Sequence, residues 1–253
     1  MPIPPDSASA PDSASALDSA SAPDSASAVD LATSIRPQRF GRTSPNDIND
    51  PIVEPLWAGV RVIGAAEGEI GALFEDGDPL VPDGISIALA RMLAETADSA
   101  IVDGYLTKQA HPQDQPQTAS LDASPSSGEL LTQTFLGLRR HKHAEEELRR
   151  EVEARARLFA PDDRVTLLVT DLLYLDGTWL LDIPLLERRR LLESVLPGDE
   201  LVRAGPYVRP PIGSWLGSWR TQGFTGITFK EANSRYRPGE TAVDWATAPM
   251  PRR

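Results

Sequence analysis

The chain has 253 residues, a mass of 27.4 kDa and 40% hydrophobic residues, which is enough for one sizeable domain and excludes a purely disordered or fibrous protein. Its net charge of -12 and pI near 4.7 argue against a general nucleic-acid coat protein, because binding to phosphate requires clustered lysine and arginine. The absence of cysteine from the sequence excludes disulfide scaffolds, thiol nucleophiles and Cys-type zinc sites.

The N-terminal residues form an acidic repeat. Residues 6–29 repeat the unit Asp-Ser-Ala-Ser-Ala followed by Pro, Leu, Pro or Val, and residues 1–30 carry a charge of -5. Such a segment buries too little apolar surface to offset its ordering entropy, so we expect residues 1–45 to be a disordered tail and linker before a domain at 46–253. The start of the chain lacks the features of a signal peptide, and no apolar run approaches the roughly 20 residues of a membrane span. We therefore expect a cytoplasmic protein with no membrane partner.

The first half of the domain is predicted to contain a hairpin, a helix and a further strand. The signals are apolar alternation for the strands, Gly-containing turns, and apolar positions that share one helical face. The expected elements are, in order, strands at 60–63 and 70–74, a turn at 76–77, a helix at 85–96 capped by Asp83, and a strand at 100–102 leading into Asp103-Gly104.

A flexible insertion is expected near 108–160. Its first part is rich in Pro, Gln, Ser and Asp, and residues 138–158 favour an exposed helix with charged pairs at four-residue spacing. The basic start of that helix could contact phosphates or simply be a solvated face. His141 and His143 would lie on different faces of the helix, so we expect no metal site there.

The second half is predicted to combine buried strands with one amphipathic helix. The expected elements are a buried strand at 164–173, a turn at 176–177, a helix at 184–196 and a half-buried strand at 223–230. Short strands mixed with a few helices, without regular alternation, predict an α+β fold with antiparallel sheets flanked by helices.

The C-terminal segment differs in charge from the rest of the chain. Residues 201–253 carry +5, and the residues between the acidic tail and this segment carry -12. Its arginines could face DNA phosphates, with aromatic side chains stacking on bases; alternatively, the aromatics pack in the core and the arginines cover its rim. The candidate DNA contacts are Arg220, Arg235 and Arg237, and the aromatics are Trp215, Trp219 and Tyr236.

Four segments carry motifs. They are Glu54-Pro-Leu-Trp-Ala-Gly-Val-Arg61, Val102-Asp-Gly-Tyr-Leu106, Thr170-Asp-Leu-Leu-Tyr-Leu-Asp-Gly177 with Pro184-Leu-Leu-Glu-Arg-Arg189, and Gly223-Phe-Thr-Gly-Ile-Thr-Phe-Lys230 with Asn233-Ser-Arg-Tyr-Arg-Pro-Gly239 and Asp244-Trp245. In this order they resemble segments of the adenylation (nucleotidyltransferase) domain of the ATP-dependent DNA ligases. The family patterns are Lys-x-Asp-Gly-x-Arg, Leu-Asp-Gly-Glu-Leu, Phe-Asp-Leu-Leu-Tyr-Leu-Asp-Gly with Leu-x-x-Arg-Arg, and Glu-Gly-Val-Val-Ala-Lys with Ser-x-Tyr-x-Pro-Gly and Asp-Trp.

The resemblance covers residues 52–247 and implies an ATP-grasp-like adenylation domain, without the C-terminal oligonucleotide-binding (OB) barrel of complete ligases. It implies ATP and Mg²⁺ as cofactors, nicked or double-stranded DNA and repair proteins as partners, and a link to DNA repair and recombination. By the matched positions, it implies nucleotide binding by Arg61, Lys230 and Trp245 and metal binding by Asp171.

Several positions that handle phosphate or metal in the family differ here. Leu56 occupies the place of the lysine whose amine attacks the α-phosphate of ATP, and a leucine side chain has no lone pair for that attack. Lys108 and Lys230 lie on other segments. The chain departs from the family at further positions. Ala58 stands where the family has Asp, Glu75 where it has Arg, and Tyr105 and Thr225 where it has Glu. Residues 246–249 lack the two lysines of the family's Trp-x-Lys-x-Lys element.

We interpret the chain as a degenerate homologue of the adenylation domain that is defective in self-adenylation and has a nucleotide-binding, DNA-binding or accessory role. One alternative is an active ligase or nucleotidyltransferase of altered mechanism, such as one that seals nicks already adenylated at the DNA 5′ end, because that step needs no lysine nucleophile. A second alternative is a protein–protein interaction module.

Overall fold

A computed structural model describes residues 26–80, 84–108 and 165–251 of the chain. Its elements are α1 (Ala28–Ser34), η1 (Pro45–Asp47), β1 (Pro51–Pro55), β2 (Val60–Glu67), β3 (Ile70–Glu75), β4 (Asp78–Leu80), α2 (Ile85–Leu93), β5 (Ser99–Thr107), β6 (Thr166–Leu175), β7 (Thr178–Trp179), α5 (Leu185–Val195), β8 (Val202–Ala204), α6 (Gly213–Thr221), β9 (Gly226–Glu231) and β10 (Trp245–Pro249). No helix within the described ranges is both long and apolar enough to cross a membrane. Asp83, the predicted helix at 138–158 and nearly all of the expected insertion lie outside them.

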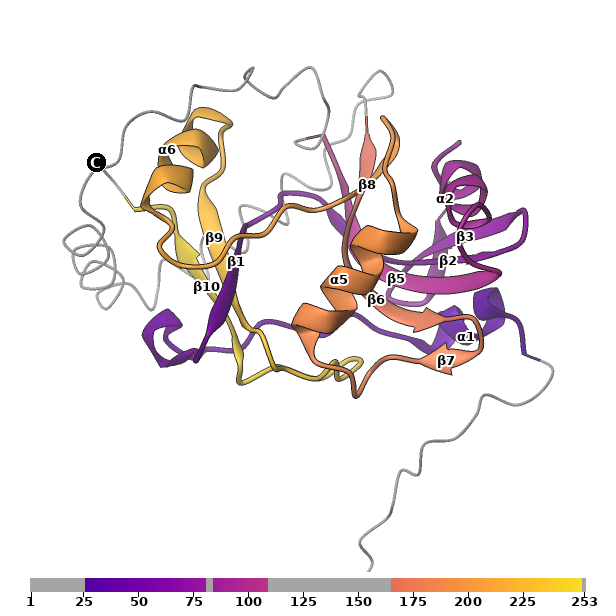
Figure 1. Cartoon of the computed structure of the whole chain (residues 1–253), viewed down its shortest axis with the longest axis horizontal. Coiled ribbons are helices and arrows are strands. Elements are labelled where there is room, and N and C mark those ends of the chain that lie inside the picture. Colours follow the sequence, from indigo (N-terminus) through magenta and orange to yellow (C-terminus); the bar gives the residue numbers. More distant parts are fainter. Residues whose placement is uncertain (1–25, 81–83, 109–164, 252–253) are drawn as a thin grey trace, which may run out of the picture.

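The described strands form two sheets. The larger has the order β4-β3-β2-β5-β6-β7 with antiparallel neighbours, and β8 pairs with β6 in parallel. The smaller is antiparallel and has the order β1-β9-β10. In Figure 1 the smaller sheet lies at the left with α6, and the larger lies at the right with α1, α2 and α5. The α+β class with antiparallel sheets and flanking helices is therefore confirmed.

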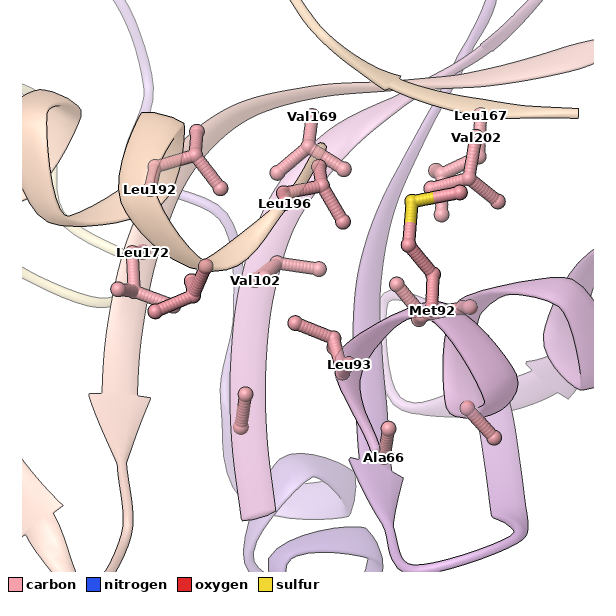
Figure 2. Close-up of a cluster of buried hydrophobic side chains, with 14 of the residues drawn as sticks. Ala66, Met92, Leu93, Val102, Leu167, Val169, Leu172, Leu192, Leu196 and Val202 are labelled. Atoms are coloured by element: carbon pink, nitrogen blue, oxygen red, sulfur yellow. The ribbon is translucent and has the colours of Figure 1, made fainter. Parts of the chain in front are cut away.

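One face of the larger sheet packs against α2 and α5. Figure 2 shows this apolar cluster, in which Val102 of β5 and Val169 of β6 face Leu93 of α2 and Leu192 of α5. Nine of the ten residues of β6 are buried, because other strands flank it on both sides and helices cover it. The continuous apolar run in the sequence is explained by this central position.

The opposite face of the larger sheet carries α1, which the sequence did not predict. Ser27 caps the helix by accepting a hydrogen bond from the Asp30 N–H. Ala28 and Ala32, four residues apart, are buried in an apolar cluster with residues of β2, β3 and β5. The expectation of a tail extending to residue 45 is therefore corrected for residues 26–45, because two small side chains suffice to dock this short helix.

The smaller sheet has its own apolar cluster beneath α6. Val53 of β1 and Phe229 of β9 pack with Leu216 and Trp219 of α6. The sequence predicted only the β9 strand of this unit. Gly213 and Gly217 weaken the helical pattern of α6, which depends on this packing rather than on helix propensity.

Most of the remaining predicted elements are confirmed with shifted ends. The β2–β3 hairpin, the turn at 176–177 and the helix now defined as α5 are present. The predicted strand at 100–102 was too short, because β5 continues through Asp103-Gly104 to Thr107 and pairs with β2 and β6. The helix predicted at 85–96 ends at Leu93, and its N-cap residue is Gly84.

Candidate functional site

Six side chains from the two sheets, five of them charged, lie where the sheets meet, and all but the half-buried Arg61 are buried. The larger sheet contributes side chains from β2, β5 and β6, and the smaller contributes side chains from all three of its strands. They are Arg61, Asp103 and Asp171 from the larger sheet and Glu54, Lys230 and Trp245 from the smaller. All four residues that the resemblance assigned to nucleotide and metal therefore lie in this region.

Lys230 is held by a carboxylate of the protein itself. Its Nζ lies 2.7 Å from Oε2 of Glu54, and the two side chains are only 2% and 3% exposed. The ammonium also lies 4.7 Å from the ring centroid of Trp245 and 5.8 Å from that of Phe40. A buried charge is costly unless it is paired, and the Glu54 carboxylate provides that partner for Lys230.

Arg61 is bound to Asp103 in the same region. Its Nε and Nη2 donate to the two carboxylate oxygens at 3.0 and 2.5 Å, and its Nη1 donates to the Gln38 carbonyl. Burial lowers the pKa of Arg61, but the Asp103 carboxylate more than offsets this and the net pKa lies above its ordinary value. The Tyr236 hydroxyl also donates to Asp103, at 2.7 Å, and accepts the Gln38 N–H.

Asp171 is enclosed by its own partners. Arg188 donates to both of its oxygens at 2.8 Å, and the Leu172 N–H donates to one of them at 2.9 Å. Burial lowers the pKa of Arg188, but the charge of Asp171 outweighs it and leaves the pKa raised. The neighbouring Arg189 donates to the Thr170 carbonyl and lies 3.8 Å from Glu54, so α5 links the two sheets.

Leu56 directly follows β1 and has no reactive group. Its side chain is buried, and its backbone N–H donates to the Gly226 carbonyl at 2.9 Å. The sequence contains three lysines. Lys230 is bound to Glu54, Lys108 lies one residue beyond β5, and Lys142 is outside the described residues. At position 56 itself, the chain therefore has no amine.

The candidate DNA contacts differ in exposure. Arg235 and Arg237 are exposed, whereas Arg220 is half-buried and donates its Nε to the Leu216 carbonyl of α6. Of the aromatic residues, Trp219 and Tyr236 are buried and pack in the core, as the second of the two interpretations predicted. Trp215 is 46% exposed.

Sequence reasoning missed the partners of the retained residues. Glu54, Asp103, Arg188 and Tyr236 all lay within quoted motifs, but the pattern assigned them no partner. A weak signal existed for Arg188, which lies three residues after Leu185 and four before Leu192, on the buried side of α5. For Glu54 there was no signal, because Lys230 is 176 residues away in the chain and only sheet pairing brings them together.

ATP and Mg²⁺, which the resemblance implied, do not fit these residues. The attacking amine is replaced by Leu56, Lys230 already neutralises a carboxylate, and Asp171 has both oxygens occupied by Arg188. Within residues 26–80, 84–108 and 165–251, no three His, Asp or Glu side chains are grouped so that they could hold a metal ion. We therefore derive no chemical step through a nucleotide or a metal.

Comparison with known families gives one match over most of the chain. A family model described as "ATP dependent DNA ligase domain" matches residues 89–247. The chain is also 36% identical over 85 residues to the multifunctional non-homologous end joining protein LigD of Mycobacterium bovis and to the DNA repair protein LigD of Mycobacterium tuberculosis. These alignments span 33% of this chain and only 11% of each relative.

Solved structures share the fold. The ligase domain of M. tuberculosis LigD superposes with a TM-score of 0.57 at 21% identity, over 85% of this chain and 59% of that chain. The mycobacterial DNA ligase D complexed with ATP and MES gives a TM-score of 0.55 at 21% identity, over 85% of this chain and 60% of that one. At this level of identity the likeness establishes a common fold, and function requires a separate argument.

Proposed function

The chain belongs to the family of the ATP dependent DNA ligase domain, and on this premise we propose that it is a member that does not adenylate itself and instead acts as a DNA-binding accessory of repair. The observation that carries the proposal is Leu56 at the nucleophile position. A phosphoramidate with AMP can form only on a nitrogen that has a free lone pair, and leucine has none.

The environment of Lys230 supports the same proposal. Nucleophilic attack requires an amine that can reach the α-phosphate, and the Nζ of Lys230 is held 2.7 Å from the Glu54 carboxylate. Lys230 also has nearly no exposed surface. Replacement of the nucleophile by this lysine would require this buried ion pair to break.

The binding part of the proposal has two supports. The relatives whose sequences match are named for non-homologous end joining and DNA repair, and exposed arginines lie outside the buried ion pairs. A domain that has the ligase fold but lacks the reactive amine retains a surface through which it can recognise DNA. The chain spans 11% of those relatives, so this partner is carried over as a proposal only.

The test is an adenylation assay on the purified full chain. With α-labelled ATP and either Mg²⁺ or Mn²⁺, we expect no labelled protein after the reaction is quenched with EDTA and SDS at neutral pH and separated by denaturing electrophoresis, conditions that a lysine–AMP phosphoramidate survives. An acid-labile label on the wild-type chain would overturn the proposal. The variants Lys108→Ala, Lys142→Ala and Lys230→Ala would then identify the amine that carries it.

A sealing assay on the same purified chain distinguishes the proposal from the alternative of an active ligase with an altered mechanism. A duplex with a nick whose 5′ end already carries AMP is incubated with the chain and each metal, and we expect no sealed product. Binding of the unadenylated nicked duplex is measured in parallel by fluorescence polarisation. Sealing would establish the alternative, whereas the absence of both sealing and binding would remove the accessory role.

A further inference from the structure

The chain contains two peptide bonds between aspartate and proline, Asp50–Pro51 and Asp78–Pro79. Asp50 lies directly before β1, and Asp78 is the first residue of the edge strand β4; both are exposed. The two bonds differ in backbone conformation. Asp50 has a φ of +42°, whereas Asp78 pairs with Glu75 within a β-hairpin. The same pair of residues therefore occurs once in a left-handed conformation and once in a strand.

The positive φ of Asp50 is not explained by a hairpin turn. Among the described residues other than glycine, Asp76 and Asp176 also have a positive φ, and each is followed by glycine in a two-residue turn between paired strands. Asp50 is instead followed by proline, whose ring crowds the preceding residue and favours an extended backbone there. A left-handed aspartate at such a position is strained, and it persists only where neighbouring contacts hold it.

Contacts on both sides of the bond hold Asp50 in place. Its carbonyl oxygen accepts the Ala232 N–H at 3.2 Å, and Nη2 of Arg209 donates to its Oδ1. Pro51 pairs with Glu231 as the first residue of β1. The Asp50 side chain is nevertheless 53% exposed, so water reaches the carboxylate and the bond beside it.

We propose that Asp50–Pro51 is a self-cleavage site at which the Asp50 carboxylate is the nucleophile. The carboxylate reaches the carbonyl carbon of its own residue by closing a five-membered ring, which makes the attack intramolecular. The Ala232 N–H already donates to the oxygen on which negative charge develops during this attack. Cleavage also frees Asp50 from the crowding of the proline ring. The inference is independent of the proposed DNA binding.

The attack forms a bond between a carboxylate oxygen and the carbonyl carbon of Asp50. The bond from that carbon to the Pro51 nitrogen then breaks, and the nitrogen takes a proton from water and becomes a secondary amine. The remaining hydroxide opens the cyclic anhydride on Asp50 and leaves its side-chain carboxylate and a new C-terminal carboxylate. One water molecule is consumed, and nothing is oxidised or reduced.

The N-terminal product is held by contacts other than the broken bond. The helix α1 packs in an apolar cluster with the larger sheet. Residues 35–42 form an extended strip along the 237–242 segment, in which the Arg39 N–H donates to the Glu240 carbonyl and the Ala242 N–H donates to the Arg39 carbonyl. We therefore expect the two products to stay together in the folded protein and to separate on denaturation.

The test compares the two Asp–Pro bonds within one sample of the purified full chain. The protein is incubated near pH 6 and about 37 °C, either folded or in concentrated urea, and the products are identified by denaturing electrophoresis and mass spectrometry. In the folded protein we expect cleavage at Asp50–Pro51 to be at least about tenfold faster than at Asp78–Pro79, a difference of about 1.4 kcal/mol in activation free energy. In urea the two rates should be similar, because the conformation that distinguishes the bonds is lost.

Two matched variants test the nucleophile. Asp50→Asn removes the carboxylate and keeps a residue type that tolerates positive φ, so cleavage at this bond should cease. Asp78→Asn is the control and should be cleaved after Asp50 at the wild-type rate. Equal thermal unfolding midpoints show that both variants are folded. A rate that is unchanged when the protein is diluted about tenfold shows that the reaction is intramolecular and not due to a contaminating protease.

Four results would overturn the proposal. They are an intact Asp50–Pro51 bond in the folded protein, equal rates at the two bonds, undiminished cleavage of Asp50→Asn, and a preference for Asp50–Pro51 that persists unchanged in urea. The last result would assign the preference to local sequence and not to the folded backbone. None of these results bears on DNA binding, which the assay with nicked duplex measures separately.

Discussion

At the scale of single residues, the residues that resemble a nucleotide site hold the protein together. Lys230 is paired with Glu54, Arg61 with Asp103, and Asp171 with Arg188. Removing one member of a buried ion pair leaves an uncompensated charge and typically costs about 3–5 kcal/mol. Each of these ion pairs therefore gives its residues a structural role, whereas Leu56 takes part in none of the three pairs.

How far the site could be predicted follows from the same residues. The loss of the nucleophile was visible directly, because Leu56 lies within a local motif. The identity of each ion-pair partner was not visible in the sequence, because Glu54 and Lys230 meet only after β1 pairs with β9. A local pattern shows which residue types are present, but the charge that a buried residue needs comes from distant parts of the chain.

Tyr236 provides a prediction about pH. Its hydroxyl joins Asp103 to the Gln38 N–H, so Tyr236→Phe should lower the free energy of unfolding by about 1–3 kcal/mol at pH 8. Burial, and then the Asp103 carboxylate, raise the pKa of Tyr236 well above its ordinary value. The unfolded chain therefore loses this proton first, and the contribution is present below about pH 10 and declines at higher pH.

The measurement is urea unfolding of both proteins at pH 8 and pH 11. The stability difference between wild type and Tyr236→Phe should shrink at pH 11. Tyr174→Phe is the matched control, because it removes a hydroxyl from another buried tyrosine. A difference that stays constant between the two pH values would contradict the assigned environment of the hydroxyl.

At the scale of elements, predictability followed the strength of the local pattern. The strand β6 and the helix α5 have long apolar signals and were predicted within a few residues of their ends. The helices α1 and α6 were missed, because one is seven residues long with two alanines inside and the other contains two glycines. Such elements form because a docking surface already exists, and a local pattern contains no information about that surface.

Two glycine substitutions test how the 35–42 strip is held. A Cβ at Gly41 would lie 1.9 Å from the backbone oxygen of Ala242, so Gly41→Ala should lower the free energy of unfolding by about 1–3 kcal/mol, as for other overpacked sites. A Cβ at Gly217 in α6 would have no neighbour within 4 Å. Gly217→Ala should therefore raise the free energy of unfolding by about 0.5–1 kcal/mol, because alanine has the higher helix propensity. Urea unfolding measures both changes. Equal effects of the two substitutions would show that the strip does not lie against the 237–242 segment.

At the scale of the whole molecule, opposite charges lie close together along the chain. Residues 1–25 contain Asp6, Asp12, Asp18 and Asp24 and no Lys or Arg, whereas Arg36, Arg39 and Arg42 follow soon after in the sequence. The net charge of -12 therefore conceals basic residues joined to an acidic segment. DNA has the same sign of charge as these four carboxylates, so the acidic segment should oppose DNA binding.

This arrangement predicts that deletion of residues 1–25 strengthens DNA binding. If each of the four charges contributes about 0.2 kcal/mol, the affinity for nicked duplex should rise about fourfold near 0.05 M salt. The gain should disappear near 0.5 M salt, where screening acts within a few ångströms. A full-length variant with Asp→Asn at all four positions separates charge from chain length and should match the deletion in fluorescence polarisation. If the deletion strengthens binding and the Asn variant does not, the repeat acts through its bulk, and the electrostatic account is wrong.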